Sequence, residues 1–385
     1  MIGKPALCCL LLGAAMTAIG CSRLENAQRC ASVEPDTRIA ACTALIEAGP
    51  NTAKSLSAYY TNRGTAYNSH RDYARAIEDH NEAIRLNPNN ATAYYNRGTA
   101  YYNKGDYDLA IRDYNEAIRL KPDYAFAYVG RGMTYAAKRD YDRAIEDYNE
   151  AIHLNPNEES AYENRGVARA FEGDDDRAIQ DYNEAIRLSP NEIAAYFGRG
   201  LARTSEGDYD RAIQDFNEVI RLKPKFALAY EKRGDAYFFQ SNLTAAIANF
   251  EAAISAAPSS NTAVYAALML HLATNRQGHD DAGQLEKVAA AADLSKWPGP
   301  VLKLYLGQMT TEDVMKAANS DIEMQKWHVC EANYFTGEDA LLHQHRATGL
   351  ARLKAARDSC PKDDTEYNAA PVELNRLSAS AVPAK

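Results

Sequence analysis

The 385-residue sequence predicts an all-α protein, built as a solenoid of antiparallel helical hairpins. Glycine, alanine and proline each recur at steps of 34 residues between residues 57 and 260. Within a step, apolar and small residues are spaced i, i+4, i+7, as in amphipathic helices, and almost no segment has the alternation of a strand. The columns are Gly64, Gly98, Gly132, Gly166, Gly200 and Gly234; Ala76, Ala110, Ala144, Ala178, Ala212 and Ala246; and Pro88, Pro122, Pro156, Pro190, Pro224 and Pro258.

Each 34-residue unit contains two helices and a turn. Tyr94, Gly98 and Tyr101 lie on one face of a first helix, and Ala110, Tyr114 and Ala117 lie on one face of a second. Lys104-Gly105-Asp106 between them predicts a turn followed by an acidic N-cap, and Pro122 ends the second helix. The apolar face of one hairpin is covered only by the next hairpin, so stability is shared along the array.

An arginine column keeps the same 34-residue step. We expect each arginine to pack its stem along the hairpin and to donate to a repeated Asp or Asn, rather than to form an anion-binding ladder. The two columns are Arg63, Arg97, Arg131, Arg165, Arg199 and Arg233, and Asp79, Asp113, Asp147, Asp181 and Asp215.

The segments around the six units also have helical patterns. The predicted domains are a signal peptide at 1–20, an N-terminal helical cap at 21–56, six repeat units at 57–260, a degenerate seventh hairpin at 261–296, a helical module ending in a diverged hairpin at 297–363, and a flexible tail at 364–385.

The first 20 residues predict export. Residues 6–19 are apolar or small, too short a run for a bilayer span of about 20 residues but suited to a signal-peptide core. The ending Ala18-Ile19-Gly20-Cys21 resembles a bacterial lipobox, which implies lipid attachment at Cys21 and anchoring to the outer membrane, facing the periplasm. The alternative is ordinary cleavage near Ala18 and a free periplasmic or secreted protein.

Four cysteines remain after the signal segment and Cys21, namely Cys30, Cys42, Cys330 and Cys360. Four cysteines allow three pairings, and spacing alone does not choose among them. Hairpin geometry favours Cys30 with Cys42 and Cys330 with Cys360, and an oxidising compartment would allow both disulfides. We expect no metal, because no CxxC occurs and the histidines near Cys330 lack zinc spacing.

The pattern of Gly, Tyr, Ala and Pro in 34 residues resembles the tetratricopeptide repeat family. The resemblance covers residues 57–260 and implies a right-handed superhelix whose inner groove binds partner proteins. Three positions depart from it: Arg169 and Arg203 replace a tyrosine, and His80 replaces an aromatic residue, so we expect looser or partly polar packing there.

The C-terminal module has a second resemblance. Three short motifs occur in the same order as in the C-terminal half of bacterial NlpI-type lipoproteins and resemble them in sequence. They are Trp297-Pro298, residues 304–308 and residues 331–338. This resemblance implies a dimerising, outer-membrane-anchored adaptor that brings cell-wall enzymes to an envelope protease.

The resemblance to tetratricopeptide repeats also places a partner-binding groove on the first helices. We expect a mainly apolar groove with some carboxylates, which favours partner segments that combine apolar anchors with Lys or Arg. The alternative is that these faces mostly pack or meet water. The predicted groove residues are Tyr95, Thr99, Tyr102, Val129, Met133, Glu163, Phe197, Leu201, Glu231 and Phe238.

Composition excludes some classes of function. The 43 Lys plus Arg against 52 Asp plus Glu give a formal charge of −9, which does not fit a nucleic-acid-binding surface. No GxSxG, HExxH or P-loop occurs, so we expect neither catalysis nor a cofactor. We therefore predict a non-catalytic adaptor of the cell envelope that binds proteins and has the capacity to dimerise. The alternative is a structural scaffold for envelope complexes.

Overall fold

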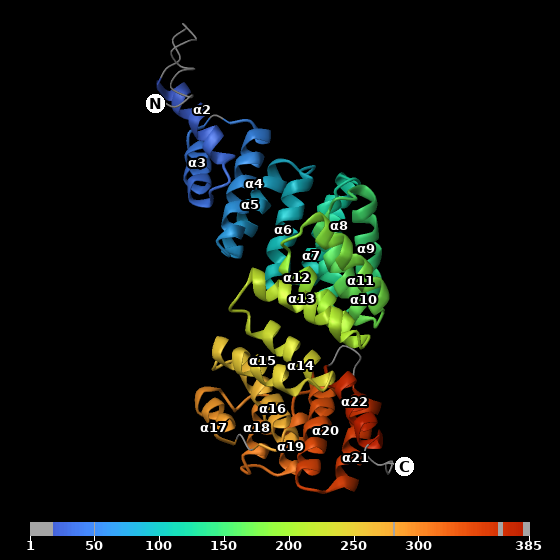
Figure 1. Cartoon of the computed structure of the whole chain (residues 1–385). Helices are drawn as coiled ribbons and strands as arrows, with labels where there is room; N and C mark the ends of the chain where they lie inside the picture. Colours follow the sequence, from blue (N-terminus) through green and yellow to red (C-terminus); the bar gives the residue numbers. More distant parts are fainter. Residues whose placement is uncertain (1–17, 50, 280–281, 361–364, 380–385) are drawn as a thin grey trace. The chain divides into compact units, whose positions relative to one another are not determined.

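The structure is a computed structural model, and it describes residues 18–49, 51–279, 282–360 and 365–379. Every regular element in these residues is an α-helix, and consecutive helices pack in pairs (Figure 1), which confirms the predicted all-α solenoid of hairpins. The helices are α2 Ala18–Cys30, α3 Pro35–Glu47, α4 Ala53–Ser69, α5 Tyr73–Leu86, α6 Ala91–Lys104, α7 Tyr107–Leu120, α8 Ala125–Ala137, α9 Tyr141–Leu154, α10 Glu159–Phe171, α11 Asp175–Leu188, α12 Ile193–Ser205, α13 Tyr209–Leu222, α14 Ala227–Phe239, α15 Leu243–Ala256, α16 Asn261–Arg276, α17 Ala282–Ala291, α18 Gly299–Tyr305, α19 Thr311–Ala318, α20 Gln325–Leu342, α21 Arg346–Ser359 and α22 Thr365–Ala379.

The chain divides into two compact units, which we describe separately. Unit 1 is Met1–Asn164 and unit 2 is Arg165–Lys385, with the boundary inside α10. Unit 1 contains the N-terminal pair α2–α3 and the hairpins α4–α5, α6–α7 and α8–α9. Unit 2 contains α11, the hairpins α12–α13 and α14–α15, and the C-terminal helices α16–α22. The domain limits expected from the sequence stay a prediction.

An aromatic ring of the second helix packs against a glycine of the first in the repeat hairpins. In unit 1, Tyr148 is 1% exposed, and a Cβ atom added to Gly132 would lie 2.7 Å from its ring. In unit 2, a Cβ atom on Gly234 would lie 2.6 Å from the Phe250 ring. Glycine therefore allows the two helices to approach until the ring fills the space between them. The buried column contains His80, Tyr114, Tyr148, Tyr182, Phe216 and Phe250.

The turn between the two helices of a hairpin uses a left-handed residue. Gly105 has φ 83°, which confirms the predicted turn and suits a residue without Cβ. Arg71, Arg139 and Ser241 occupy the same turn position with φ near 60°, at a cost of about 1 kcal/mol each. The following residue caps the second helix by accepting a backbone N–H at Asp72, Asp140, Asp174, Asp208 and Asn242, whereas Asp106 makes no such bond.

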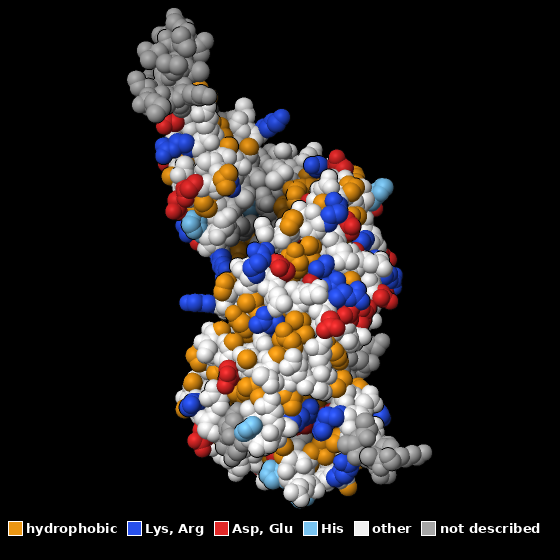
Figure 2. Space-filling model, viewed as in Figure 1, with side chains coloured by type: hydrophobic (Ala, Val, Ile, Leu, Met, Phe, Trp, Pro, Cys, Tyr) orange, Lys and Arg blue, Asp and Glu red, His pale blue; other side chains and the backbone are white. Residues whose placement is uncertain are grey.

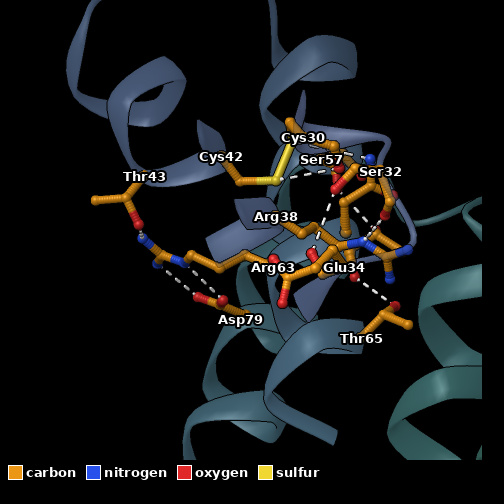
Figure 3. The surroundings of a disulfide bond; sticks show 12 residues. Cys30, Ser32, Glu34, Arg38, Cys42, Thr43, Ser57, Arg63, Thr65 and Asp79 are labelled. Atoms are coloured by element: carbon orange, nitrogen blue, oxygen red, sulfur yellow. Dashed lines mark hydrogen bonds and ion pairs between the residues drawn. A yellow bond between two sulfur atoms is a disulfide. The ribbon is translucent and has the colours of Figure 1, made fainter. Parts of the chain in front are cut away.

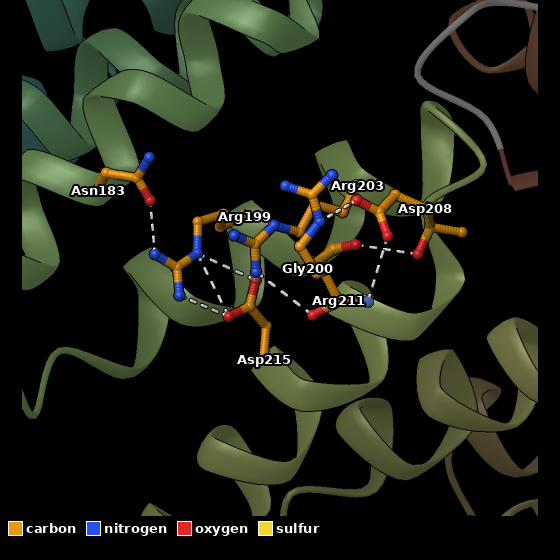
Figure 4. Close-up of polar contacts among 8 residues, drawn as sticks. Asn183, Arg199, Gly200, Arg203, Asp208, Arg211 and Asp215 are labelled. Atoms are coloured by element: carbon orange, nitrogen blue, oxygen red, sulfur yellow. Dashed lines mark hydrogen bonds and ion pairs between the residues drawn. The ribbon is translucent and has the colours of Figure 1, made fainter.

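The arginine column joins neighbouring hairpins within each unit. In unit 1, Arg131 donates to Asp147 through Nε at 2.9 Å and Nη2 at 2.6 Å, and its Nη1 donates to Asn115 of the preceding hairpin at 2.5 Å. In unit 2, Arg199 makes the equivalent bonds to Asp215 and Asn183 (Figure 4). These bidentate, charge-assisted bonds confirm the predicted structural role of the column.

At two positions that depart from the repeat pattern, a second arginine pairs with the aspartate that the column arginine already binds. Arg203 donates through Nη1 to Asp215 at 2.7 Å, beside Arg199 (Figure 4), and Arg169 donates to Asp181 at 2.8 Å. Partial burial lowers the pKa of both arginines. The polar packing expected at these positions is therefore an arginine–aspartate–arginine cluster.

The N-terminal pair α2–α3 has its own small core. Cys30 and Cys42 are 1% and 0% exposed, and the structure brings them to disulfide distance, with Cα atoms 4.8 Å apart (Figure 3). Arg63 of α4 donates through Nη1 to Thr43 of α3 at 3.0 Å, which attaches this pair to the first repeat hairpin. The predicted signal segment lies mostly outside the described residues, as does the Cys21 side chain.

The C-terminal helices of unit 2 share one core. Leu268, Leu302, Phe335 and Leu353, which come from four helices, are fully buried together. Cys330 of α20 and Cys360 at the end of α21 lie at disulfide distance, with Cα atoms 4.8 Å apart. Both cysteine pairs therefore match the pairing that hairpin geometry favours.

Residues 365–379 differ from the expected flexible tail. They form α22, whose Ala370 and Leu377 are 0% and 6% exposed. Arg346 of α21 donates to the Leu377 carbonyl at 3.0 Å, and Glu373 forms an ion pair with Arg276 of α16 at 2.7 Å. Helix α22 packs against α20 and α21. The composition of this segment alone did not indicate that it would be ordered by these contacts.

His80 is the irregular member of the aromatic column in unit 1. Its ring is completely buried beside Gly64, and neither ring nitrogen has a hydrogen-bond partner. Burial lowers the pKa of His80 from 6.5 to about 3, so the imidazole is neutral in the folded chain at ordinary pH. The site is tightly packed rather than loose, and a protonatable group occupies an apolar position.

We expect His80→Tyr to stabilise unit 1, and more strongly in acid. Between pH 6.5 and 3 the unfolded chain protonates His80 while the folded chain does not, so wild-type stability falls as the pH falls through that window. The variant should gain about 3 kcal/mol more unfolding free energy at about pH 4.5 than at about pH 7.5, measured by urea denaturation. The exposed His153→Tyr is the control, and an equal gain at both pH values would contradict the explanation.

Candidate functional site

The predicted groove residues divide between the two units. We use the term groove face for the surface formed by the predicted groove residues on the first helices of the hairpins. These residues are Tyr95, Thr99 and Tyr102 on α6, Val129 and Met133 on α8, Glu163 on α10, Phe197 and Leu201 on α12, and Glu231 and Phe238 on α14. The members on α6, α8 and α10 belong to unit 1, and the others belong to unit 2. Their assignment to a binding site stays a prediction.

The groove face of unit 1 contains a cluster of aromatic rings. The Tyr95 ring centroid lies 5.1 Å from that of Tyr124 and 5.9 Å from that of Tyr114. Tyr124 also meets Phe126 edge-to-face at 6.5 Å, and Phe126 is 51% exposed. Burial raises the pKa of Tyr124 to about 12 and also raises that of Tyr95, so both hydroxyls are protonated donors at neutral pH. The cluster offers partly exposed apolar surface with polar edges.

The other groove-face residues of unit 1 are buried or half-buried. Val129 is 6% exposed, Met133 is half-buried, and the Tyr102 ring lies 5.9 Å from the Tyr107 ring. Thr99 accepts a hydrogen bond from the buried Tyr114 hydroxyl at 3.3 Å. The aromatic surface on this face of unit 1 is therefore centred on Tyr95 and its aromatic neighbours.

Sequence reasoning missed Tyr124 and Phe126. Phe126 lies three residues before Val129 and seven before Met133, so helical spacing places it on the same face of α8. Tyr124 is the N-cap residue of α8, directly before the helix. The signal that could have found both is the pair of aromatic residues two positions apart at the start of α8.

The groove face of unit 2 begins with an equivalent aromatic cluster. The Phe197 ring lies 5.8 Å from Phe216 and 5.5 Å from Phe226, positions three repeat lengths after those of Tyr95, Tyr114 and Tyr124. Leu201 is 37% exposed beside it on α12. Each unit therefore has one aromatic cluster at the same place in the repeat.

Farther along unit 2, the C-terminal helices cover the groove face. Phe238 is 4% exposed, and the Arg276 guanidinium lies 4.2 Å from its ring centroid. Arg276 also pairs with Glu338 of α20 at 3.1 Å and with Glu373 of α22 at 2.7 Å. Phe238 is thus occupied by contacts within the chain, which the spacing of α14 could not reveal.

A pocket lies on the groove face between α14 and α16. Its volume is about 210 Å³, and Glu331 of α20 also lines it. Glu231 is 3% exposed there, and Lys232 lies 2.8 Å from Glu231 and 3.2 Å from Asp235. Burial raises the pKa of Asp235, because the shared lysine compensates only partly for lost hydration. The lining residues are Leu228, Glu231, Lys232, Asp235, Asn261, Thr262, Tyr265, Met269 and Glu331.

The surface has mixed charge. On the face drawn in Figure 2, basic side chains alternate with acidic and hydrophobic ones, and the described residues show no continuous basic area there. None of the helices in the described part of the chain combines the length and the apolar character that crossing a membrane requires.

Sequence families described as tetratricopeptide repeats match much of the chain. One matches residues 91–124 and 125–158, a second matches 64–105, 172–203 and 200–240, and a third matches 231–294. Together they cover more than half of the sequence and confirm the repeat resemblance. The resemblance of the C-terminal module to NlpI-type lipoproteins stays a prediction.

Solved structures with similar folds are also tetratricopeptide proteins. A tetratricopeptide repeat protein from Parabacteroides merdae is 20% identical with a TM-score of 0.50, and the match covers 66% of this chain and 98% of that one. MamA is 30% identical over 43% of this chain and 91% of its own, with a TM-score of 0.41. YrrB, described as having an unusual peptide-binding site, is 25% identical over 49% and 98%, with a TM-score of 0.43. No curated protein sequence matches the chain.

The ion-pair cluster around Arg276 has a pH-dependent member. Glu338 is 3% exposed, one of its oxygens has no hydrogen-bond partner, and burial raises its pKa from 4.5 to about 7 despite Arg276. Glu373, which also pairs with Arg376, adds a second carboxylate nearby. The folded chain therefore holds a proton on Glu338 that the unfolded chain releases between pH 4.5 and 7.

We expect Glu338→Gln to flatten the pH dependence of unit 2. Because the folded-state pKa is raised, the stability that Glu338 contributes below pH 4.5 is lost as the pH rises through about 7. The unfolding free energy of the wild type, from urea denaturation, should decrease more between about pH 5 and about pH 8 than that of the variant. The exposed Glu312→Gln should keep the wild-type slope, and parallel slopes for wild type and Glu338→Gln would refute the assignment.

Proposed function

We infer the function of this chain from the premise that it belongs to the tetratricopeptide repeat family. Proteins of this family are generally interaction modules without a catalytic site. We propose that the chain is a non-catalytic adaptor of the bacterial cell envelope, which binds segments of partner proteins on its groove faces.

The aromatic cluster of unit 1 is the observation that carries the proposal. Tyr95, Tyr124 and Phe126 form a connected group of rings, and Phe126 is half-exposed although it belongs to a packed helix. Aromatic side chains with a polar edge supply much of the binding energy at protein interfaces, because they bury large apolar areas at small entropic cost. A partner segment with apolar anchors would cover this surface.

The envelope location rests on two independent features. The pattern of residues 1–21 resembles a lipoprotein signal, and two cysteine pairs lie at disulfide distance. Disulfides persist in oxidising compartments such as the periplasm. The motif resemblance of the C-terminal module to NlpI-type lipoproteins supports the same location and adds the proposal that the adaptor presents clients to an envelope protease or cell-wall enzyme.

Loss of the aromatic cluster should release the partner. We expect Tyr95→Asp with Phe126→Asp to reduce partner capture from detergent-solubilised envelopes by roughly tenfold or more, because buried aromatic anchors dominate such interfaces. Leu109→Asp is the matched control, since it places the same charge at an exposed apolar position of α7, a second helix. Circular dichroism verifies that each variant is folded. Equal capture by the wild type and the double variant would defeat the groove-face proposal.

Cys21→Ser tests the anchor. A lipidated chain partitions with membranes, because two acyl chains give stable attachment. The variant lacks the thiol that would carry the lipid, so it should appear in the soluble envelope fraction. Fractionation and the mass of the mature N-terminus measure this directly. A mature chain that begins elsewhere than at residue 21, with no added lipid mass, would contradict the lipoprotein assignment and favour a free exported protein.

A further inference from the structure

The pocket between α14 and α16 belongs to unit 2 alone and has a defined shape and charge. We call it the acidic pocket, with the nine lining residues given above. Its volume of about 210 Å³ is below the ~300–1,000 Å³ typical of sites for drug-sized molecules, so it suits a single side chain or a small group. It lies on the groove face, where Glu231 was predicted to meet a partner.

The lining of the pocket contains more carboxylates than cations. Glu231, Asp235 and Glu331 face one ammonium group, that of Lys232, which leaves two formal negative charges in excess. Lys232 is committed to Glu231 at 2.8 Å and to Asp235 at 3.2 Å. This excess disfavours an anion as the occupant, and it gives a cation a favourable partner at short range.

Glu331 is held in position by neutral donors from two other segments. The Tyr265 hydroxyl of α16 donates to Glu331 Oε2 at 2.6 Å, and the Trp297 Nε1–H donates to the same oxygen. Neutral donors fix the geometry of the carboxylate without cancelling its charge. The site is thus assembled from α14, α16, α20 and the loop before α18.

Apolar groups lie beside the charges. Leu228 and Met269 line the same pocket, and they supply contact surface for an aliphatic chain. A lysine or arginine side chain combines an aliphatic stem with a cationic end, and it commonly buries the stem while the end meets an acid. A purely apolar side chain would bring no positive charge to complement the excess of carboxylates in the lining.

We propose that the acidic pocket receives one lysine or arginine side chain of a partner protein segment. This inference rests on the proposed function, because the occupant is part of the segment that the groove faces bind. The cation lies between Glu331 and Asp235, and the stem contacts Leu228 and Met269. Burial raises the pKa of Asp235, and Lys232 lowers it only in part. A bound cation would lower this pKa further and so favour the charged carboxylate.

The indole of Trp297 provides a direct readout. The chain has two tryptophans, so a ¹⁵N spectrum of the full mature protein shows two indole signals, and Trp327→Phe assigns them. The probes are acetylated, amidated Ala-Ala-Lys-Ala-Ala, its Arg counterpart, and its norleucine counterpart. We expect the Lys and Arg peptides to shift the Trp297 signal in a saturable way, with the norleucine peptide at least about tenfold weaker, as for a lost charge-assisted bond.

Glu331→Gln keeps an acceptor for Tyr265 and Trp297 but removes the charge, and Asp235→Asn is a second variant should the first lose its fold. Either should weaken the Lys peptide by about tenfold. Glu251→Gln, on exposed surface of α15 in the same hairpin as the pocket's α14, is the matched control and should bind as the wild type does. Thermal unfolding verifies each fold.

Several outcomes overturn the proposal. They are equal shifts by the norleucine peptide, no saturable shift by the Lys or Arg peptide, or unchanged affinity in both folded variants. Free lysine amide that binds as tightly as the peptide would make the occupant a small amine and would refute a partner segment. Partner capture that depends on Tyr95 and Phe126, together with no Lys-peptide binding, would retain the proposed function and remove only this inference.

Discussion

The close approach of the two helices in each hairpin depends on a glycine that faces an aromatic ring. At Gly132 and Gly234 the ring occupies the space that a Cβ atom would need, so ring and backbone are in direct contact. The interhelical distance then determines where the arginine of the first helix meets the aspartate of the second, since Arg131 directly precedes Gly132 and Asp147 directly precedes Tyr148. The bidentate bond is a consequence of the packing, and it fixes the two helices relative to each other.

The same packing decides which surface is left for binding. The second helices direct their rings inward, so the first helices present the remaining face, on which Tyr95 and Phe197 each join two further rings. In unit 2 the chain covers part of this face itself, because Arg276 packs over Phe238 and is held there by ion pairs with Glu338 and Glu373. What remains there is a smaller, charged pocket rather than an open aromatic surface.

Much of the fold followed from periodicity, because the 34-residue columns report local contacts. Helices α16, Asn261–Arg276, and α17, Ala282–Ala291, lie where the pattern predicted a seventh hairpin, and Gly105 lies in the expected turn with φ 83°. Contacts between distant segments were not predictable in the same way. Nothing in the spacing of α14 shows that Arg276 of α16 covers Phe238, or that Trp297 and Tyr265 meet at Glu331, since these contacts depend on how the irregular C-terminal helices pack against the repeats. The order of residues 365–379 was missed for the same reason.

The arginine column also has a consequence for how such a chain can change in length. Arg131 bonds an aspartate of its own hairpin and an asparagine of the preceding one, and Arg199 repeats the pattern in unit 2. A tandem duplication of 34 codons in register would therefore bring a complete set of donors and acceptors, and it would leave no polar group stranded at either junction. The gene can lengthen or shorten its array one hairpin at a time, while the end segments stay unchanged.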